Sequence, residues 1–299
     1  MAIPIRRLAR PQALVNPTAD SALRTDGLAP IGDRLLDDAG CRHLRNFFKD
    51  RFPGTRGGFH NDFFLPNTEF RLAATLEMAP LLYEPTVALF EGYTPFLYTF
   101  LAKFPGDNSA LGIHRDWMYI DERRGDRSFI LYIALEDQMA ENGAIRFLPR
   151  SHRLHGPLCG TRLIWPWLMN RNVIRDRQLE LPLRAGEAAV WDNSLIHSSG
   201  PNSSGELRLA VGVWFRPVEV GLAHFSRDGD HHAVRYGVDE CFFTSETPFT
   251  LLERAPAWPI IERISLVHVD TTAATMESVL DHRQPTRLGW AADLGAKSR

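Results

Sequence analysis

The sequence predicts a mainly β fold, an antiparallel sandwich or barrel with flanking helices. Three observations support this fold class. From Pro95 onward, apolar residues alternate with a period of two, as in strands with one buried face. Several short segments of this kind follow one another with turn residues between them. No helical pattern separates them regularly, which disfavours a parallel sheet with crossover helices.

The predicted strands are short, except the last. Residues 128–136 (SFILYIALE) are apolar on both faces, which is typical of a strand in the middle of a buried sheet. The final segment, 206–217 (ELRLAVGVWFRP), alternates most clearly. The other predicted strands cover residues 97–104, 144–149, 179–183 and 187–192.

Helical spacing precedes the strands. In residues 33–52, apolar side chains recur at steps of three and four, which predicts an amphipathic helix. Residues 69–91 show a second helical pattern, and we expect Pro80 and Pro85 to interrupt it. Residues 1–30 contain proline, glycine and small polar residues, so we expect them to wrap the surface.

The whole chain, residues 1–299, is expected to form a single domain, because β domains of this size are common. Within it, residues 1–94 are predicted to be an N-terminal helical support and residues 95–217 the β core. Residues 221–299 are predicted to be a C-terminal cap of polar loops with weak helical segments, such as 275–281.

Composition narrows the class of protein. The net charge of −2 gives no indication of a nucleic-acid or membrane partner, and no apolar run is long enough to span a bilayer. The three cysteines, Cys41, Cys159 and Cys241, lie far apart, so we expect free thiols in a cytoplasmic protein. The start of the chain lacks the apolar segment of a secretory signal. The oligomeric state is left open.

A candidate metal site comes from His114, Asp116 and His197. In an extended backbone, side chains two residues apart point the same way, so His114 and Asp116 can reach one ion while Arg115 points elsewhere. His197 follows the predicted strand 187–192. Two histidines and one carboxylate leave open coordination positions, a pattern typical of non-haem Fe(II) that activates O2.

Other histidines are weaker candidates. His152 and His155 are expected to be structural or loop residues. A second stretch contains Asp228, Asp230, His231 and His232. It is expected to be a polar loop near the mouth of the site, although neighbouring histidines also suit a metal.

Arg208 is the candidate anchor for a 2-oxoacid cosubstrate. Alternation places Arg208, Ala210, Gly212 and Trp214 on one face of their strand, and the small residues leave room beside the guanidinium. A buried arginine needs an anionic partner, and its planar fork suits a carboxylate. The alternatives are an arginine that pairs with a structural carboxylate and one that is simply exposed.

Three further residues are candidates for the same cosubstrate site. Ser199 lies two residues after His197 and is expected on the same side. Lys103 either faces the site or extends to solvent at its strand end. Tyr132 either lines the pocket or fills the core.

Three ordered segments together resemble a known family. They are LAKFPGDNSALGIHRD (101–116), IALEDQMAENGAIRFLPRSH (133–152) and LRAGEAAVWDNSLIHSSGPNSSGELRLAVGVWF (183–215). The chain resembles the phytanoyl-CoA hydroxylase-like group of Fe(II)/2-oxoglutarate dioxygenases over about residues 95–217, and more loosely over 26–95. Two positions depart from the family pattern, since Arg150 replaces a glycine and Arg115 a frequent glutamine.

The resemblance implies a fold and a chemistry. The fold would be a double-stranded β-helix, a jelly-roll barrel. His114, Asp116 and His197 would map to iron, and Arg208 and Ser199 to the distal carboxylate of 2-oxoglutarate. Lys103 would map to a family lysine near the cosubstrate.

The expected activity is O2-dependent hydroxylation of an unactivated C–H bond of a small organic metabolite, with release of succinate and CO2. Desaturation, epimerisation and ring formation use the same ligands and stay open. Two competing hypotheses are a metal-dependent enzyme that does not use 2-oxoglutarate and a non-catalytic jelly-roll binding protein. Side chains expected at the mouth of the pocket are Arg115, Trp117, Tyr119, Trp165 and Trp167.

Overall fold

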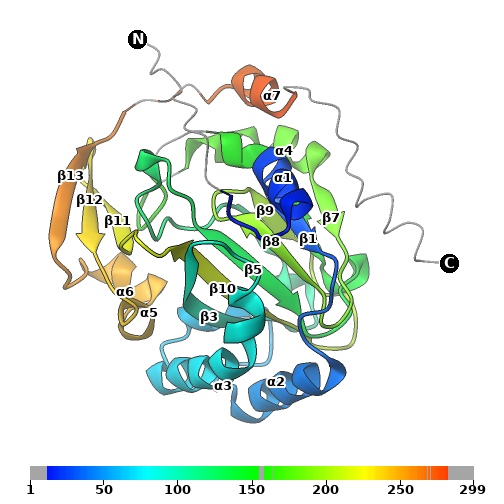
Figure 1. The fold of residues 1–299 in the computed structure, drawn as a ribbon. Helices are drawn as coiled ribbons and strands as arrows, with labels where there is room; N and C mark the ends of the chain where they lie inside the picture. Colours follow the sequence, from blue (N-terminus) through cyan, green and yellow to red (C-terminus); the bar gives the residue numbers. More distant parts are fainter. Residues whose placement is uncertain (1–11, 155–157, 164, 268, 270, 282–299) are drawn as a thin grey trace.

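The computed structural model describes residues 12–154, 158–163, 165–267, 269 and 271–281. Its helices are α1 (Pro17–Asp26), α2 (Asp38–Arg51), α3 (Thr68–Val87), α4 (Arg171–Arg177), α5 (Phe242–Ser245), α6 (Pro248–Glu253) and α7 (Ala273–Asp281), with the 3-10 turn η1 at Asp62–Phe64 (Figure 1). The strands are β1 (Leu28–Ile31), β2 (Phe59–Asn61), β3 (Tyr93–Lys103), β4 (Leu111–His114), β5 (Phe129–Ala134), β6 (Ile145–Phe147), β7 (Leu179–Leu181), β8 (Ala188–Asp192), β9 (His197–Ser199), β10 (Arg208–Pro217), β11 (Ala223–Asp228), β12 (His232–Gly237) and β13 (Ile260–Ser265).

Two antiparallel sheets form the core of the molecule. The larger has the strand order β1-β8-β5-β10-β3-β2, and the smaller has the order β4-β9-β6-β7. Apolar side chains from both sheets, including Ile130, Trp191 and Trp214 from the larger and Phe147 from the smaller, pack into one cluster between them. The two sheets are therefore the layers of a double-stranded β-helix, as expected.

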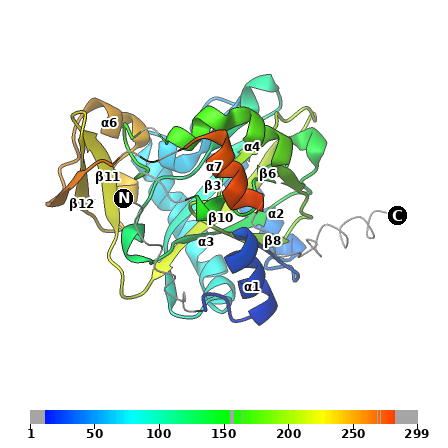
Figure 2. The same ribbon diagram turned by 90° about the horizontal axis from the view of Figure 1, so that it is seen from above.

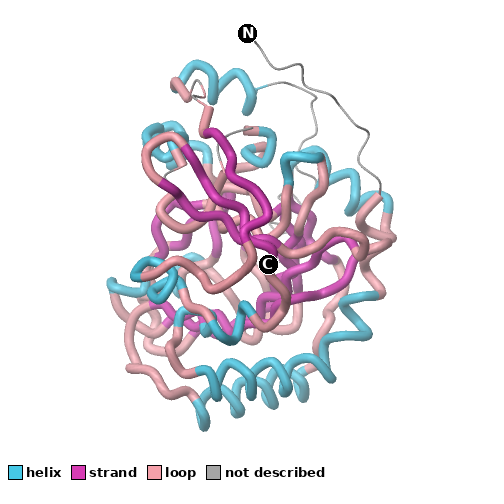
Figure 3. Tube along the Cα trace, turned by 90° about the vertical axis from the view of Figure 1, so that its left-hand side faces the viewer, coloured by secondary structure: helices cyan, strands magenta, loops and turns pink. Residues whose placement is uncertain are grey.

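Helices cover the outer face of the larger sheet. Alternate residues of its strands, such as Phe100, Leu131 and Val211, are fully buried in a second cluster shared with α1, α2 and α3. In Figure 3 the helices lie outside the layered strands. The alternation read from residues 206–217 is confirmed, since Val211 packs against the helices and Trp214 packs into the inter-sheet cluster.

The N-terminal region contains more regular structure than we expected. Residues 1–30 were expected only to wrap the surface, but they contain α1 and the start of β1, and β1 pairs with β8 at the edge of the larger sheet. Asn16 caps α1, with its side chain accepting from two backbone N–H groups, and Pro17 occupies the first turn. Gly27 ends the helix in a left-handed conformation (φ 81°).

The helix α3 runs through both of its prolines, so the predicted interruption at Pro80 and Pro85 is wrong. Each proline lacks one helical hydrogen bond. The buried stripe of Phe70, Ala74, Met78 and Leu82 keeps the helix on the sheet. Packing of this stripe therefore outweighs the local cost of the prolines. The other predicted helix, within residues 33–52, is confirmed as α2.

The C-terminal region also differs from the prediction of polar loops. Strands β11, β12 and β13 form a separate antiparallel sheet, which lies on the side of the molecule away from α1 and β8 (Figure 2). Charged residues such as Asp228 and Arg235 within these strands obscure the alternation. The predicted helical segment 275–281 lies within α7. In the described part of the chain, no helix combines the length and apolar character needed to cross a bilayer.

Arg150, one of the two departures from the family pattern, has a backbone φ of 71°. This left-handed conformation favours glycine, so arginine is strained here. Its Nε donates to Asp26 Oδ1 at 3.2 Å and its backbone N–H donates to Asp26 O at 2.8 Å. The paired contacts hold the turn in the conformation that a glycine would adopt freely.

Candidate active site

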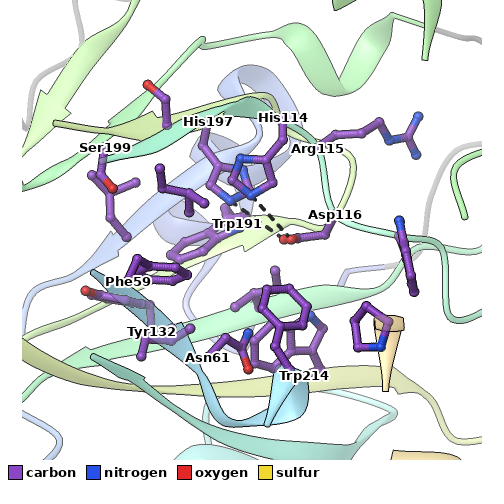
Figure 4. Close-up of a pocket in the computed structure, with 18 of the residues that line it drawn as sticks. Phe59, Asn61, His114, Arg115, Asp116, Tyr132, Trp191, His197, Ser199 and Trp214 are labelled. Carbon is purple, nitrogen blue, oxygen red and sulfur yellow. Dashed lines mark ion pairs between the residues drawn. The ribbon is translucent and has the colours of Figure 1, made fainter. Parts of the chain in front are cut away.

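The residues predicted to bind a metal converge at the junction of two strands. β4 pairs with β9 so that His114 lies directly opposite His197, and Asp116 follows β4 by two residues. Asp116 Oδ1 lies 3.7 Å from His114 Nε2, and Asp116 Oδ2 lies 3.8 Å from His197 Nε2 (Figure 4). One ligand atom from each residue falls within 4.8 Å of the others, so a single ion fits among them.

Backbone carbonyls orient both imidazoles. His114 Nδ1 lies 2.8 Å from Gly112 O, and His197 Nδ1 lies 2.9 Å from Leu195 O. A carbonyl only accepts, so each Nδ1 carries the proton and donates it, which leaves the Nε2 lone pair directed at Asp116. Burial and, to a smaller extent, the neighbouring His114 lower the pKa of His197 to about 4. The imidazole is therefore held in the neutral form that binds a metal.

Arg208 lies at the end of the same cavity and has no anionic partner among the described residues. Its side chain is almost fully buried, and Nη1 donates to Gly143 O at 2.6 Å. Nε is buried without a hydrogen-bond partner. In the part of the chain that the structure describes, no carboxylate lies within ion-pair distance of it, so it is neither a structural ion pair nor an exposed arginine. A buried guanidinium left unpaired is costly, so the site suits an anionic ligand.

Lys103 is the cross-strand neighbour of Arg208 and is fully buried, so it does not extend to solvent. Its Nζ donates to Ser109 O (2.8 Å), Ser199 Oγ (2.7 Å) and Gly200 O (2.6 Å). Burial and the nearby arginines lower the pKa of Lys103 to about 7. Ser199 lines the cavity, whereas Lys103 lies behind it and is joined to it by the hydrogen bond to Ser199 Oγ.

Tyr132 serves both roles considered for it. Its ring is buried between the sheets, and it also lines the cavity. The hydroxyl donates to Gln138 Oε1 at 2.8 Å, and burial raises the pKa of Tyr132. The phenol is therefore held in place as part of the cavity wall.

The cavity, of about 280 Å³, lies between the sheets and contains the three candidate ligands. Sequence reasoning missed much of its wall. Trp214 shares the strand face of Arg208, so alternation could have identified it, whereas β2 is too short to show any pattern. The wall residues that were missed include Phe59, Asn61, Phe64, Leu101, Ile130, Ile145, Trp191, Trp214 and Pro248.

The residues expected at the mouth divide into two groups. Arg115, Trp117 and Tyr119 line the cavity, although the Arg115 side chain points away from the histidines (Figure 4). Its Nη2 reaches Glu122 Oε2 at 3.4 Å. Trp165 and Trp167 are not at the mouth. They are buried in a separate apolar cluster, together with side chains of α4 and α7.

The remaining histidine predictions have mixed outcomes. His152 is buried and its Nε2 contacts Arg24 O at 3.1 Å, which is a structural role. His155 lies outside the described residues. Asp228 and His232 were expected in a loop but end and begin two paired strands, and only the turn between them is irregular. In the described part of the chain, the metal-type cluster consists of His114, Asp116 and His197 alone.

Comparison with known proteins gives a family match. Residues 73–210 match the family model described as Phytanoyl-CoA dioxygenase (PhyH). A search of the curated proteins found no match to the sequence.

Several solved structures share the fold. The epimerase SnoN, in complex with Fe3+, alpha ketoglutarate and nogalamycin RO, is 20% identical, with a TM-score of 0.52 over 85% of this chain and 96% of that chain. EvdO2 from Micromonospora carbonacea var. aurantiaca, complexed with 2-oxoglutarate, is 17% identical, with a TM-score of 0.50 over 72% of this chain and 94% of that chain. HygX from Streptomyces hygroscopicus, with nickel and 2-oxoglutarate bound, is 14% identical, with a TM-score of 0.50 over 69% of this chain and 88% of that chain.

The jelly-roll fold, the cluster of two histidines and one aspartate, and the family match define a non-haem oxygenase that depends on iron and 2-oxoglutarate. The match to the phytanoyl-CoA dioxygenase family model covers a little under half of the chain.

Proposed function

We propose that the protein uses O2 and 2-oxoglutarate to hydroxylate an unactivated C–H bond of a small organic metabolite, releasing succinate and CO2. The observation that carries the proposal is the placement of Arg208 in the cavity that contains the three ligands. The Arg208 guanidinium, which has no carboxylate partner among the described residues, suits one end of a dicarboxylate. The metal site of three ligands suits the other end of the same molecule.

Each predicted site residue has a proposed role. His114, Asp116 and His197 would hold the iron through Nε2, a carboxylate oxygen and Nε2. When bound, the iron supplies the oxygen activation that amino-acid side chains lack. Arg208 and Ser199 would bind the distal carboxylate of the cosubstrate. The apolar walls keep water out of the space between the ligands and the substrate.

Lys103 would act through Ser199. An ammonium only donates, so Ser199 Oγ accepts from Lys103 Nζ. The hydroxyl proton of Ser199 then stays free to donate to a carboxylate in the cavity. Tyr132 would position the cosubstrate by contact, since its own hydroxyl proton is donated to Gln138.

Residues 1–299 are proposed to work as one dioxygenase domain, with the helical N-terminal support, β core and C-terminal cap predicted above. The support for this is Arg71 of α3, which donates to the backbone carbonyls of Phe243, Thr244 and Glu246 and so holds the C-terminal region against the N-terminal one. The free thiols of Cys41, Cys159 and Cys241 support a cytoplasmic location.

The direct test is anaerobic titration with Fe(II) and 2-oxoglutarate, monitored by the metal-to-ligand charge-transfer band. We expect the band in the wild-type protein. Arg208→Ala should raise the Kd for 2-oxoglutarate by more than about 30-fold, or about 2 kcal/mol, because a buried charged contact is lost. Arg216→Ala, on the same strand outside the cavity, is the matched control.

Two results would contradict the proposal. An unchanged Kd in Arg208→Ala would remove the cosubstrate role and favour an enzyme that does not use 2-oxoglutarate. A wild-type protein without the band would favour a non-catalytic jelly-roll binding protein. A metabolite screen by succinate release then identifies the product by mass: hydroxylation adds an oxygen, desaturation or ring formation removes two hydrogens, and epimerisation leaves the mass unchanged.

A further inference from the structure

The cavity has two ends with different chemistry. Arg208 pairs with Lys103 in the β10–β3 register, whereas Trp214 pairs with Leu97, six residues along each strand and about 20 Å away. Asn61 in β2 pairs with Leu101, away from Lys103. Figure 4 shows Asn61 and Trp214 next to each other and Ser199 well apart from them. We call the lining formed by Asn61, Phe64, Trp117, Trp214 and Pro248 the far half of the cavity.

Hydrogen-bond donors of the far half without a described partner include the side-chain amide of Asn61 and the buried Nε1 of Trp214. Asn61 Oδ1 accepts from Phe63 N at 3.0 Å, which identifies the other end of the amide as Nδ2. No described residue accepts a hydrogen bond from Nδ2, and Asn61 is only partly buried. The amide therefore offers a donor, and no acceptor, to a molecule in the cavity.

The wall of the far half is flat and aromatic. The indole of Trp214 folds back over Gly212, where an added Cβ would lie 2.5 Å from Trp214 Cζ3 and 2.9 Å from Cη2. The glycine is therefore needed for the position of this ring. Trp214 is only 5% exposed, so its position is set by packing. Aromatic faces of this kind stack well on flat rings.

Among the described lining residues, no cation is available in the far half to neutralise a charged substrate. The arginines of the lining are Arg115 and Arg208. The Arg115 guanidinium points away, paired with Glu122 and lying 5.9 Å from the Trp165 ring centroid. Arg208 lies at the opposite end. A phosphate or carboxylate in the far half would be desolvated without a partner, which is strongly unfavourable.

We propose that the far half of the cavity binds an uncharged substrate with a flat ring, which stacks on Trp214, and an oxygen acceptor, which receives a hydrogen bond from Asn61 Nδ2. The inference rests on the proposed function for the assignment of the Arg208 end to 2-oxoglutarate. Asn61 and Trp214 are then residues that determine specificity.

Three related probes test the chemistry by calorimetric titration of the protein loaded anaerobically with Fe(II) and 2-oxoglutarate. They are 1-tetralone, which is an uncharged ketone, tetralin, which lacks the oxygen, and 1-naphthoate, which carries a carboxylate. We expect 1-tetralone to bind at least about 5-fold more tightly than tetralin, the contribution of one hydrogen bond. We expect 1-naphthoate to bind most weakly. Equal or tighter binding of 1-naphthoate, or no binding of 1-tetralone at millimolar concentration, would overturn the proposal.

Variants assign the contacts. Asn61→Asp keeps the oxygen that accepts from Phe63 N but removes the donor, so the affinity for 1-tetralone should fall about 5–30-fold while that for tetralin is unchanged. Asn67→Asp makes the same change at an exposed helix cap outside the cavity and should have no effect. Gly212→Ala should weaken both probes by displacing Trp214. If Gly212→Ala does not fold, the comparison of Asn61→Asp with Asn67→Asp still tests the proposal. An unchanged affinity for 1-tetralone in Asn61→Asp refutes the role of the amide.

The same titration without Fe(II) and 2-oxoglutarate separates this inference from the proposed function. If the charge-transfer band is absent but 1-tetralone still binds in a manner that depends on Asn61, the oxygenase function fails and the binding site stands. If the band forms and the probes show no preference, the function stands and the binding site fails.

Discussion

The two faces of the six-stranded sheet use the same strands for different purposes. On the helix-covered face, residues such as Phe100, Leu131 and Val211 are fully buried and apolar. On the cavity face, alternate positions of the same strands hold Arg208 and Tyr132, which need polar partners. Because neighbouring residues in a strand point to opposite faces, stability and binding are encoded in alternating positions.

The difference teaches which substitutions affect folding and which affect binding. Removing a side chain from the helix-covered face leaves a void in a close-packed cluster. Removing one from the cavity face alters a space that is already open to a ligand. We therefore expect stability and ligand affinity to respond separately to changes on the two faces, and the following predictions test that separation.

The largest expected effect is on the cavity side. Asp116→Ala should abolish succinate formation and the Fe(II)/2-oxoglutarate absorption band, because two imidazoles without the carboxylate no longer form the three-ligand face. The free energy of unfolding should change by less than about 1 kcal/mol, as for a partly exposed polar side chain. Asp107→Ala, at an exposed position outside the cavity, is the control, and normal turnover in Asp116→Ala would contradict the ligand assignment.

A pair of adjacent residues compares the faces directly. Phe100→Ala should lower the free energy of unfolding by about 3–5 kcal/mol and leave the Kd for 2-oxoglutarate unchanged, because the ring packs only against the helix-side cluster. Leu101→Ala, half-buried at the cavity wall, should cost less than about 2 kcal/mol and change the affinity for 1-tetralone. Urea unfolding measures the free energy of unfolding of each variant, and calorimetry measures the ligand affinities. Similar stability losses in the two variants would show that the faces are not separate.

A buried carboxyl at the edge of the larger sheet should make the stability of the protein depend on pH. Asp62, the first residue of η1 directly after β2, accepts from Phe100 N at 3.0 Å, and burial raises the pKa of Asp62 to about 7. The unfolded carboxyl has a pKa of about 4, so between about pH 4 and pH 7 the folded state holds a proton that the unfolded state has lost. Its contribution to the free energy of unfolding is therefore full below about pH 4 and falls as the pH rises to about 7.

Asp62→Asn isolates this contribution. The stability of the variant relative to the wild type should rise by about 1–3 kcal/mol between about pH 5 and pH 8, measured by urea unfolding. The Asn side chain keeps an oxygen for Phe100 N. A stability difference that does not vary with pH would show that Asp62 titrates normally in the folded protein.

The smallest expected effect comes from the helix cap beside the covered face. Asn16→Ala removes the side-chain acceptor for Thr18 N and Ala19 N, so it should lower the free energy of unfolding by about 1 kcal/mol. The Kd for 2-oxoglutarate should stay the same, because α1 packs on the larger sheet away from the cavity. A changed Kd in this variant would indicate that the helices influence the site.

Local geometry accounts for what could be predicted from the sequence. The period of two placed Arg208 and Trp214 on one strand face, and the spacing of two placed His114 and Asp116 on the same side of an extended segment. Both follow from the backbone geometry of a single strand, which depends on nearby residues alone. The order of such strands predicted an antiparallel sandwich or barrel, and the family resemblance implied the jelly-roll.

Tertiary structure decided the pairings between distant segments. The β4–β9 pairing brought His197 opposite His114, and the three-residue strand β2 placed Asn61 in the cavity wall. Packing also carried α3 through its prolines and buried Trp165 away from the mouth. These outcomes depend on which apolar surfaces cover one another across the whole molecule, a global balance that no local pattern of residues contains.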